Sequence, residues 1–206
     1  YPVRAYGKDF DHNGIFDMIP SVYLPDQKGV LQEFPAEGRD DMLKQMNSLR
    51  RKFPSYKDFA VATMKDVLSP EDRKGALILE ANEFRSCYLR NEGNGKFSMH
   101  PLPQAAQYSM INGMTVDDFD EDGNLDVLLT GNDYGTEPLV GRYDALNGLF
   151  LKGDGKGNFL PLSILQSGIY IPGNGKAVAE LKAAKGQTLI AASQNRGYLK
   201  LFALRK

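Results

Sequence analysis

The sequence predicts a mainly β protein built from about three repeats of one strand-rich unit. Two segments, Leu89–Phe97 and Leu151–Phe159, match position by position as an apolar strand end, a glycine-rich turn and a returning aromatic. This pattern indicates a β-hairpin in each. Two acidic loops, Asp9–Asp17 and Asp118–Asp126, precede the hairpins in the same order, and the run Val127–Thr130 after the second is β-type.

A third unit follows when the hairpin spacing of 62 residues (151 minus 89) is added to the second. Asn112-Gly113 then recurs as Asn174-Gly175, so the strand pattern continues. The acidic pattern does not, because Lys182 takes the third loop position and Ala184 the fifth. A lysine ammonium repels a cation, so we expect this repeat to keep its sheet and to have lost the ion.

The first unit contains a helical insertion, predicted from about 25 to 75. The first loop starts at Asp9, 80 residues before the hairpin residue Leu89, whereas the second starts at Asp118, only 33 residues before Leu151. The first unit therefore has 47 extra residues. Apolar residues recur in the excess at helical spacing, and Ser55 and Ser69 carry capping signals. The expected apolar positions are Met42, Met46, Leu49, Phe53, Ala60, Met64, Val67 and Leu68. Such short helices need a surface to cover, so we expect them to pack on the sheet.

Composition excludes several function classes. Twenty-five basic and 26 acidic residues nearly cancel, and no basic stripe suits a phosphate backbone, so nucleic acid is not an expected partner. No apolar run reaches membrane-spanning length. The chain begins at Tyr1 rather than at methionine, which is expected of a processed or excised piece of a longer protein.

The acidic loops predict two calcium sites. Calcium takes six to eight hard oxygen ligands, and side-chain oxygens at positions one, three, five and nine converge, with a glycine permitting the turn at position six. Magnesium prefers a stricter octahedron, and an EF-hand is excluded because position twelve is Pro20 or Leu129. The alternative is a pair of solvated acidic turns. The predicted ligands are Asp9, Asp11, Asn13, Asp17 and the Ile15 carbonyl, then Asp118, Asp120, Asp122, Asp126 and the Asn124 carbonyl.

These loops and hairpins resemble FG-GAP and VCBS repeats, the calcium-loop blades of integrin-α-like β-propellers. The stretch from Gly131 to Gly157 is similar to that of exported bacterial VCBS-repeat proteins, including those that end in an ASPIC/UnbV segment. The resemblance implies about three propeller-type blades in a single domain over 1–206, structural calcium, and a place in the periplasm, on the cell surface or outside the cell. Three blades do not close a ring, so we expect an incomplete, arc-like propeller whose exposed edges pair with other blades or chains.

No catalytic set is apparent, because the only histidines, His12 and His100, lie in a loop and beside a proline, and the paired carboxylates are committed to a cation. The leading hypothesis is therefore a non-catalytic calcium-binding module that binds a protein or glycan partner or acts as a scaffold. The alternative is a calcium-dependent hydrolase acting on polysaccharide or phosphoester. A candidate ligand-binding loop contains Asn132, Asp133, Tyr134, Arg142 and Asp144, although a loop held by its own hydrogen bonds explains the same residues.

Overall fold

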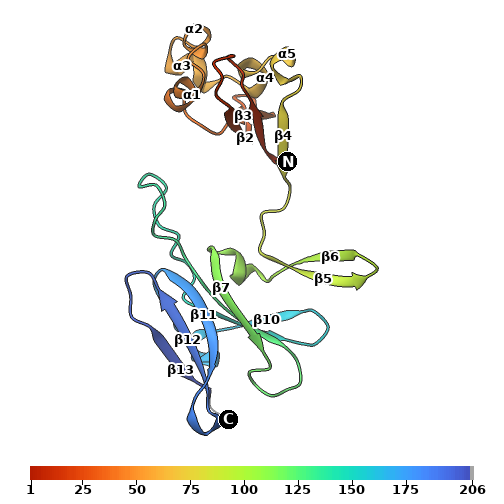
Figure 1. Ribbon diagram of the computed structural model, residues 1–206, viewed down its shortest axis with the longest axis vertical. Coiled ribbons are helices and arrows are strands. Elements are labelled where there is room, and N and C mark those ends of the chain that lie inside the picture. The colour runs from red at the N-terminus through yellow and green to blue at the C-terminus, as the bar shows by residue number, and fades with distance from the viewer. Residues whose placement is uncertain (205–206) are drawn as a thin grey trace. The chain divides into compact units, whose positions relative to one another are not determined.

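The computed structural model describes residues 1–204, apart from the Lys185 side chain, and its fold is mainly β (Figure 1). The chain divides into two compact units, Tyr1–Phe84 and Arg85–Lys206. The first unit has one antiparallel sheet and one hydrophobic cluster, and the second has three sheets and two clusters among the described residues. The predicted fold class is thus confirmed as mainly β, while the propeller-type blades and the single domain over 1–206 stay predictions.

The first unit contains a four-stranded antiparallel sheet in the order β3-β2-β1-β4. The first acidic loop joins its two central strands, β1 and β2. Tyr6 of β1 faces Ile19 of β2 across this pair. The strands are β1 (Val3–Lys8), β2 (Asp17–Pro25), β3 (Leu31–Pro35) and β4 (Leu77–Ala81).

The predicted insertion is helical only in part, because β3 lies inside the range 25–75. Glu33 of β3 accepts hydrogen bonds from the Tyr6 hydroxyl at 3.0 Å and from the Ser21 hydroxyl at 2.7 Å. These contacts tie the segment to the sheet before the helices begin. The helices are α1 (Arg39–Gln45), α2 (Leu49–Lys52), α3 (Tyr56–Ala60), α4 (Met64–Val67) and α5 (Pro70–Arg73).

The helices bury their apolar residues against the sheet, as predicted. Met42, Met64 and Leu68 are fully buried and belong to the same cluster as Tyr6 and Ile19. The predicted position Ala60 was wrong, since it is exposed and its neighbour Phe59 is buried instead. The helical segment therefore supplies much of the first unit's core.

The second unit contains two larger antiparallel sheets, in the orders β10-β9-β8-β7 and β11-β12-β13. The second acidic loop joins β7 to β8, just as the first joins β1 to β2. Within residues 1–204 the third repeat has three strands where the second has four. The strands are β7 (Ile111–Asp117), β8 (Asp126–Gly131), β9 (Leu149–Gly153), β10 (Phe159–Leu162), β11 (Gly175–Lys182), β12 (Thr188–Gln194) and β13 (Lys200–Ala203).

These two sheets pack together through β7 and β11. Leu128, Val178 and Ile190 share one buried cluster between them. The Asn112 amide donates to the Gly175 carbonyl at 2.9 Å. A Cβ atom on Gly113 would lie 2.7 Å from the Ala177 Cα, so only glycine permits this approach of the two backbones.

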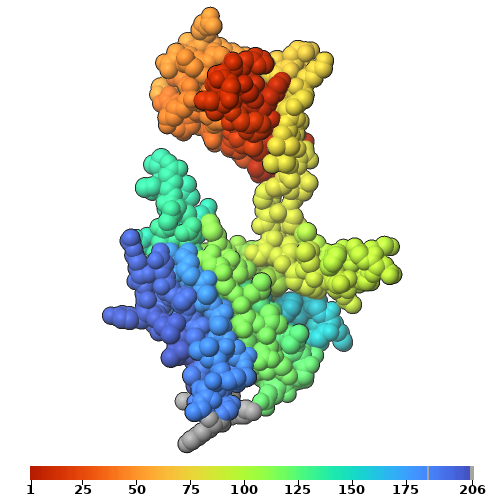
Figure 2. Space-filling view, viewed as in Figure 1, coloured from red at the N-terminus to blue at the C-terminus, as the bar shows by residue number. Residues whose placement is uncertain are grey.

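Both predicted hairpins are present, but the first does not belong to the sheet that carries the first loop. The strands β5 (Cys87–Gly93) and β6 (Lys96–Pro101) form a separate two-stranded sheet, yellow-green in Figure 2. If the first repeat had the same strand order as the second, this hairpin would continue the sheet beside β2. In the structure β3 pairs with that edge of β2 instead. Within the second unit, Tyr88 of β5 instead donates its hydroxyl to the Gly157 carbonyl at 2.9 Å.

Short helical segments complete the second unit: η1 (Gln104–Gln107), α6 (Ile164–Ser167) and η2 (Ala184–Gly186). None of the helices within residues 1–204 combines the length and apolar character that a membrane crossing needs. Each described sheet is open, with different strands at its two edges, and none closes into a barrel. The arc-like assembly of blades stays a prediction.

Candidate metal centre

The first acidic loop has the backbone that its sequence pattern demands. His12 and Gly14, at loop positions four and six, have φ values of 60° and 86°. The second loop repeats this conformation at Glu121 and Gly123, with φ values of 59° and 87°. A non-glycine residue seldom adopts positive φ, so the match at two unrelated side chains shows that both loops have the same local fold.

Hydrogen bonds to the first aspartate hold each loop in this shape. In the first loop, Asp9 accepts from the Asn13 N–H at 3.0 Å and from the Gly14 N–H at 2.9 Å. In the second, Asp118 accepts from the Asp122 N–H at 3.0 Å and from the Gly123 N–H at 2.9 Å. The first aspartate of each loop therefore organises the turn.

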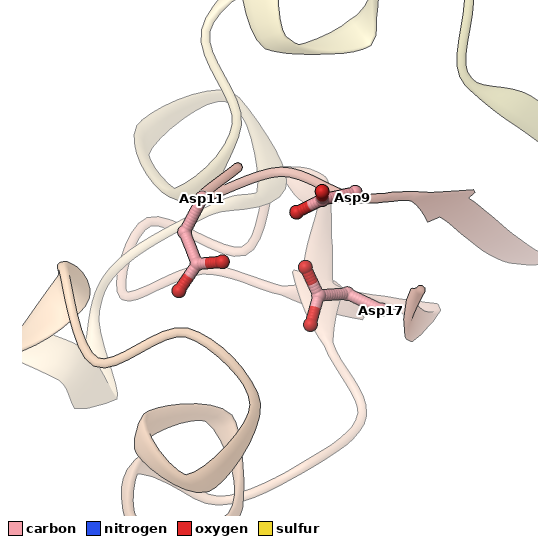
Figure 3. A group of neighbouring side chains, drawn as sticks. All are labelled: Asp9, Asp11 and Asp17. Carbon is pink, nitrogen blue, oxygen red and sulfur yellow. The ribbon is translucent and has the colours of Figure 1, made fainter. Parts of the chain in front are cut away.

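Three carboxylates converge in the first loop. Asp9, Asp11 and Asp17 each offer an oxygen, and these atoms lie within 4.8 Å of one another (Figure 3). Asp17 is buried at the start of β2, where it accepts from the Phe10 N–H at 3.0 Å. Burial raises the pKa of the Asp17 carboxyl, and the charges of Asp11 and Asp9 act in the same direction. A bound cation would relieve this repulsion.

Asp11 fits the role of a metal ligand best. Its Oδ1 atom is buried and has no hydrogen-bond partner among the described residues. A buried carboxylate oxygen without a hydrogen-bond partner destabilises the folded protein unless it is paired with a charge or coordinates a metal. Nor do Asp9, Asp11 or Asp17 form an ion pair within residues 1–204. The first loop thus presents an uncompensated cluster of hard oxygen atoms.

The second loop brings together the equivalent carboxylates. Oxygens of Asp118, Asp120 and Asp126 lie within 4.8 Å of one another. Asp126 is fully buried and accepts from the Phe119 N–H at 3.3 Å, as Asp17 does from Phe10. Burial likewise raises the pKa of the Asp126 carboxyl.

The second loop differs from the first in having its own cation. Lys152 of β9 forms ion pairs with Asp120 and, at 2.9 Å, with Asp122. The hydrogen bond from Lys152 lowers the pKa of the Asp122 carboxyl, and the bonds to Asp120 and Asp122 raise that of Lys152. Asp122 lies outside the converging carboxylate group.

No family model, curated protein or solved structure matches this chain.

The remaining predicted ligands are the oxygens of Asn13 and the carbonyls of Ile15 and Asn124. The Asn13 Oδ1 accepts from the Ile15 N–H at 2.7 Å, and the Asp122 Oδ1 accepts from the Asn124 N–H at 2.9 Å. Position five therefore has the same turn-forming bond in both loops. The two backbone carbonyls stay predictions as ligands.

The third repeat replaces the cluster with an internal ion pair. Lys182 contacts the carboxylate of Glu180, the residue at the first loop position. The loop that follows is short and is closed by a bond from the Ala183 N–H to the Gln187 carbonyl at 2.8 Å. An ammonium thus lies beside the carboxylate that would otherwise start the site.

The candidate ligand-binding loop projects from the second unit between β8 and β9, in the blue-green part of the chain (Figure 2). Asn132 lies at its base and is fully buried. Its amide donates to the Leu146 carbonyl at 2.7 Å and to the Gly173 carbonyl at 2.9 Å, and its oxygen accepts from the Leu146 N–H at 2.9 Å. Asn132 is therefore committed to holding the loop.

The other predicted residues of this loop mostly contact one another. Asp133 and Tyr143 exchange backbone hydrogen bonds at 2.9 Å. Tyr134 donates its hydroxyl to Asp144, which raises the pKa of the tyrosine, and the Arg142 guanidinium lies 4.8 Å from the centre of the Tyr134 ring. These contacts agree with a loop held by its own interactions, and they leave Arg142 at the surface.

Proposed function

We propose that this chain is a non-catalytic calcium-binding repeat module of an exported or cell-surface bacterial protein, acting in protein or glycan binding or as a scaffold. The repeats are proposed to be blades of an incomplete propeller. Calcium in the two loops stabilises the strand connections and so the surfaces that the blades present.

The observation that carries the proposal is the common geometry of the two loops. Carboxylates at positions one, three and nine converge in each, and the same backbone N–H groups donate to the first of them. Solvated acidic turns have no reason to share both features, because like charges repel and separate in water. A cation at each loop accounts for the convergence.

Calcium is favoured over other metals by the ligand chemistry. Both clusters consist of carboxylates, and oxygen-only sets suit calcium, magnesium or manganese rather than zinc or copper. The loops are irregular and partly exposed, which favours the flexible coordination of calcium over the strict octahedron of magnesium.

A non-catalytic role is proposed in preference to the hydrolase because the loop residues have structural partners. Asp144 accepts from the Tyr134 hydroxyl and from the Asn132 amide at 3.4 Å. Asp144 is thus held within its own loop, whereas a glycosidase needs two carboxylates that flank the scissile bond. The extracytoplasmic location is supported by the resemblance of the loops to VCBS repeats.

Calorimetric titration with calcium tests the proposal. The wild-type protein should bind two calcium ions, and Asp11→Ala or Asp120→Ala, at the matched third position, should each remove one. In melting experiments each occupied site adds about 2.7 kcal/mol at a free calcium concentration a hundredfold above its dissociation constant. Asp41→Asn is the control, because it removes an exposed carboxylate outside both loops.

Two results would count against the proposal. Metal-free protein that melts at the same temperature with calcium and with chelator has no calcium site. Reproducible turnover of a glycan or phosphoester, lost in Arg142→Ala or Asp144→Ala, would favour the hydrolase.

A further inference from the structure

The two acidic loops differ most in how their charge is balanced. In the first, the three carboxylates have no ion pair within the described residues. In the second, the Lys152 ammonium contacts Asp120 and lies 2.9 Å from the Asp122 Oδ2. Lys152 thus pairs with the carboxylates at loop positions three and five.

The position of Lys152 beside the loop is fixed by the sheet. Leu151 pairs with Val127 in the β8–β9 ladder, so the next residue of β9 lies level with the end of the loop. The Gly153 N–H then donates to the Asp126 Oδ1 at 2.8 Å, which ties β9 directly to the last loop position. The side chain of Lys152 is about one-third exposed, at 36%.

From this geometry we propose that Lys152 is a built-in counter-cation of the second loop, which keeps the loop's affinity for calcium below that of the first; the inference rests on the calcium binding proposed above. Calcium must displace the ammonium from Asp120 or bind beside it against a like charge. Either course weakens binding. Charge count alone gives the opposite order, because Asp122 adds a charge where Asn13 is neutral.

The third repeat supports this reading of the lysine. There Lys182 contacts Glu180, and both residues lie at the end of β11. The three repeats thus form a series: carboxylates without a counter-cation, carboxylates with a displaceable lysine from the neighbouring strand, and a carboxylate paired with a lysine of its own strand. In the second member an ammonium already holds the place of a cation, which a calcium ion of higher charge can take over.

Removing the Lys152 charge tests the inference in the full chain. Asp11→Ala silences the first loop at small structural cost, because the Asp11 side chain has no hydrogen bond among the described residues. Asp120→Ala, at the matched position, silences the second. With calcium alone as the probe, we expect the second loop to bind more weakly than the first. Lys152→Met in the Asp11→Ala background should tighten the second loop by about fivefold.

Lys156→Met is the matched control, because it removes the same charge from the same hairpin. Lys156 forms no ion pair with Asp120 or Asp122. Thermal unfolding gives a second readout. Without metal, Lys152→Met should be less stable than wild type, and saturating calcium should raise its melting temperature by more than it raises that of wild type.

Equal calcium affinity in Lys152→Met and Lys156→Met would overturn the role of Lys152, and so would a second loop that already binds as tightly as the first. These results leave the calcium sites standing. A first loop that binds no calcium in Asp120→Ala would overturn the proposed function itself, and this inference with it.

Discussion

The Asp126 carboxylate accepts a hydrogen bond from the Gly153 N–H at 2.8 Å, joining the second acidic loop to strand β9. Its other oxygen accepts from the Phe119 N–H at 3.3 Å. Asp126 is completely buried, so both bonds lie away from water. The residue at loop position nine is therefore a structural acceptor as well as a predicted metal ligand.

Replacing Asp126 with asparagine should destabilise the metal-free protein by about 1–2 kcal/mol. An amide accepts at one oxygen only, so one of the two backbone N–H groups would face an NH₂ group. The relief of charge repulsion offsets part of this cost. Urea denaturation in chelator measures the change.

Asp11→Asn is the matched control for this prediction. It removes a carboxylate from the first loop without breaking a hydrogen bond within residues 1–204, and it should leave stability unchanged or slightly raise it. A similar loss of stability in both variants would show that Asp126 acts through its charge and not through its hydrogen bonds.

The contact between β7 and β11 depends on Gly113. A Cβ atom there would lie 2.7 Å from the Ala177 Cα, and backbone atoms cannot move aside as a side chain can. Gly113→Ala should therefore destabilise the protein by about 2 kcal/mol through strain between the two sheets. Thermal unfolding followed by circular dichroism measures this.

Gly38→Ala is the comparison for the same measurement. Gly38 precedes α1 with φ of −70°, and a Cβ atom there meets nothing within 4 Å. Its cost should be about 0.5 kcal/mol, because alanine is a poorer N-cap than glycine but also reduces the conformational entropy of the unfolded chain. A Gly113→Ala protein as stable as Gly38→Ala would mean that the two sheets are not packed as closely as described.

Asn132 should prove essential to the fold rather than to ligand binding. It is buried with φ of 83°, and its side chain bonds to Leu146 and Gly173. Asn132→Ala leaves those carbonyls and the Leu146 N–H unsatisfied and places alanine in a strained conformation, which together cost about 3 kcal/mol or more. Chemical denaturation measures the loss.

Tyr134→Phe is the control, because it removes one hydroxyl near the surface of the same loop. Its cost should be within about 0.5 kcal/mol. Equal costs for the two variants would contradict the central role of Asn132.

The loops and hairpins could be predicted from the sequence because their constraints are local. Gly14 and Gly123 mark turns that need positive φ, and each first aspartate bonds to residues only four and five positions later. The helix start at Ser55 was likewise predicted correctly from its capping box with Asp58.

Strand partners and the role of Lys152 could not be read in the same way. A β-strand sequence does not specify its neighbour, so nothing local showed that β3 takes the edge beside β2. Lys152 approaches Asp120 from a strand 32 residues later. This contact depends on the pairing of β8 with β9, which brings Lys152 level with the end of the loop.

The helix start at Thr63 should lose stability in acid. The Asp66 carboxylate accepts from the Thr63 hydroxyl at 2.6 Å and from the Thr63 N–H at 2.8 Å. These bonds, the hydroxyl first, hold the pKa of Asp66 below its ordinary value of 3.8. Because the folded-state pKa is depressed, the stabilisation is present above 3.8 and is lost as pH falls through the folded-state pKa.

Asp66→Asn should therefore cost about 0.5–1 kcal/mol at neutral pH, and the difference from wild type should shrink toward zero as the pH falls through the folded-state pKa of Asp66. Urea denaturation across this pH range measures the difference. Lys65→Gln removes an adjacent exposed charge. Its effect on the free energy of unfolding should not follow the titration of Asp66. A difference for Asp66→Asn that is the same at both ends of the range would show that the ionised carboxylate does not stabilise this helix start.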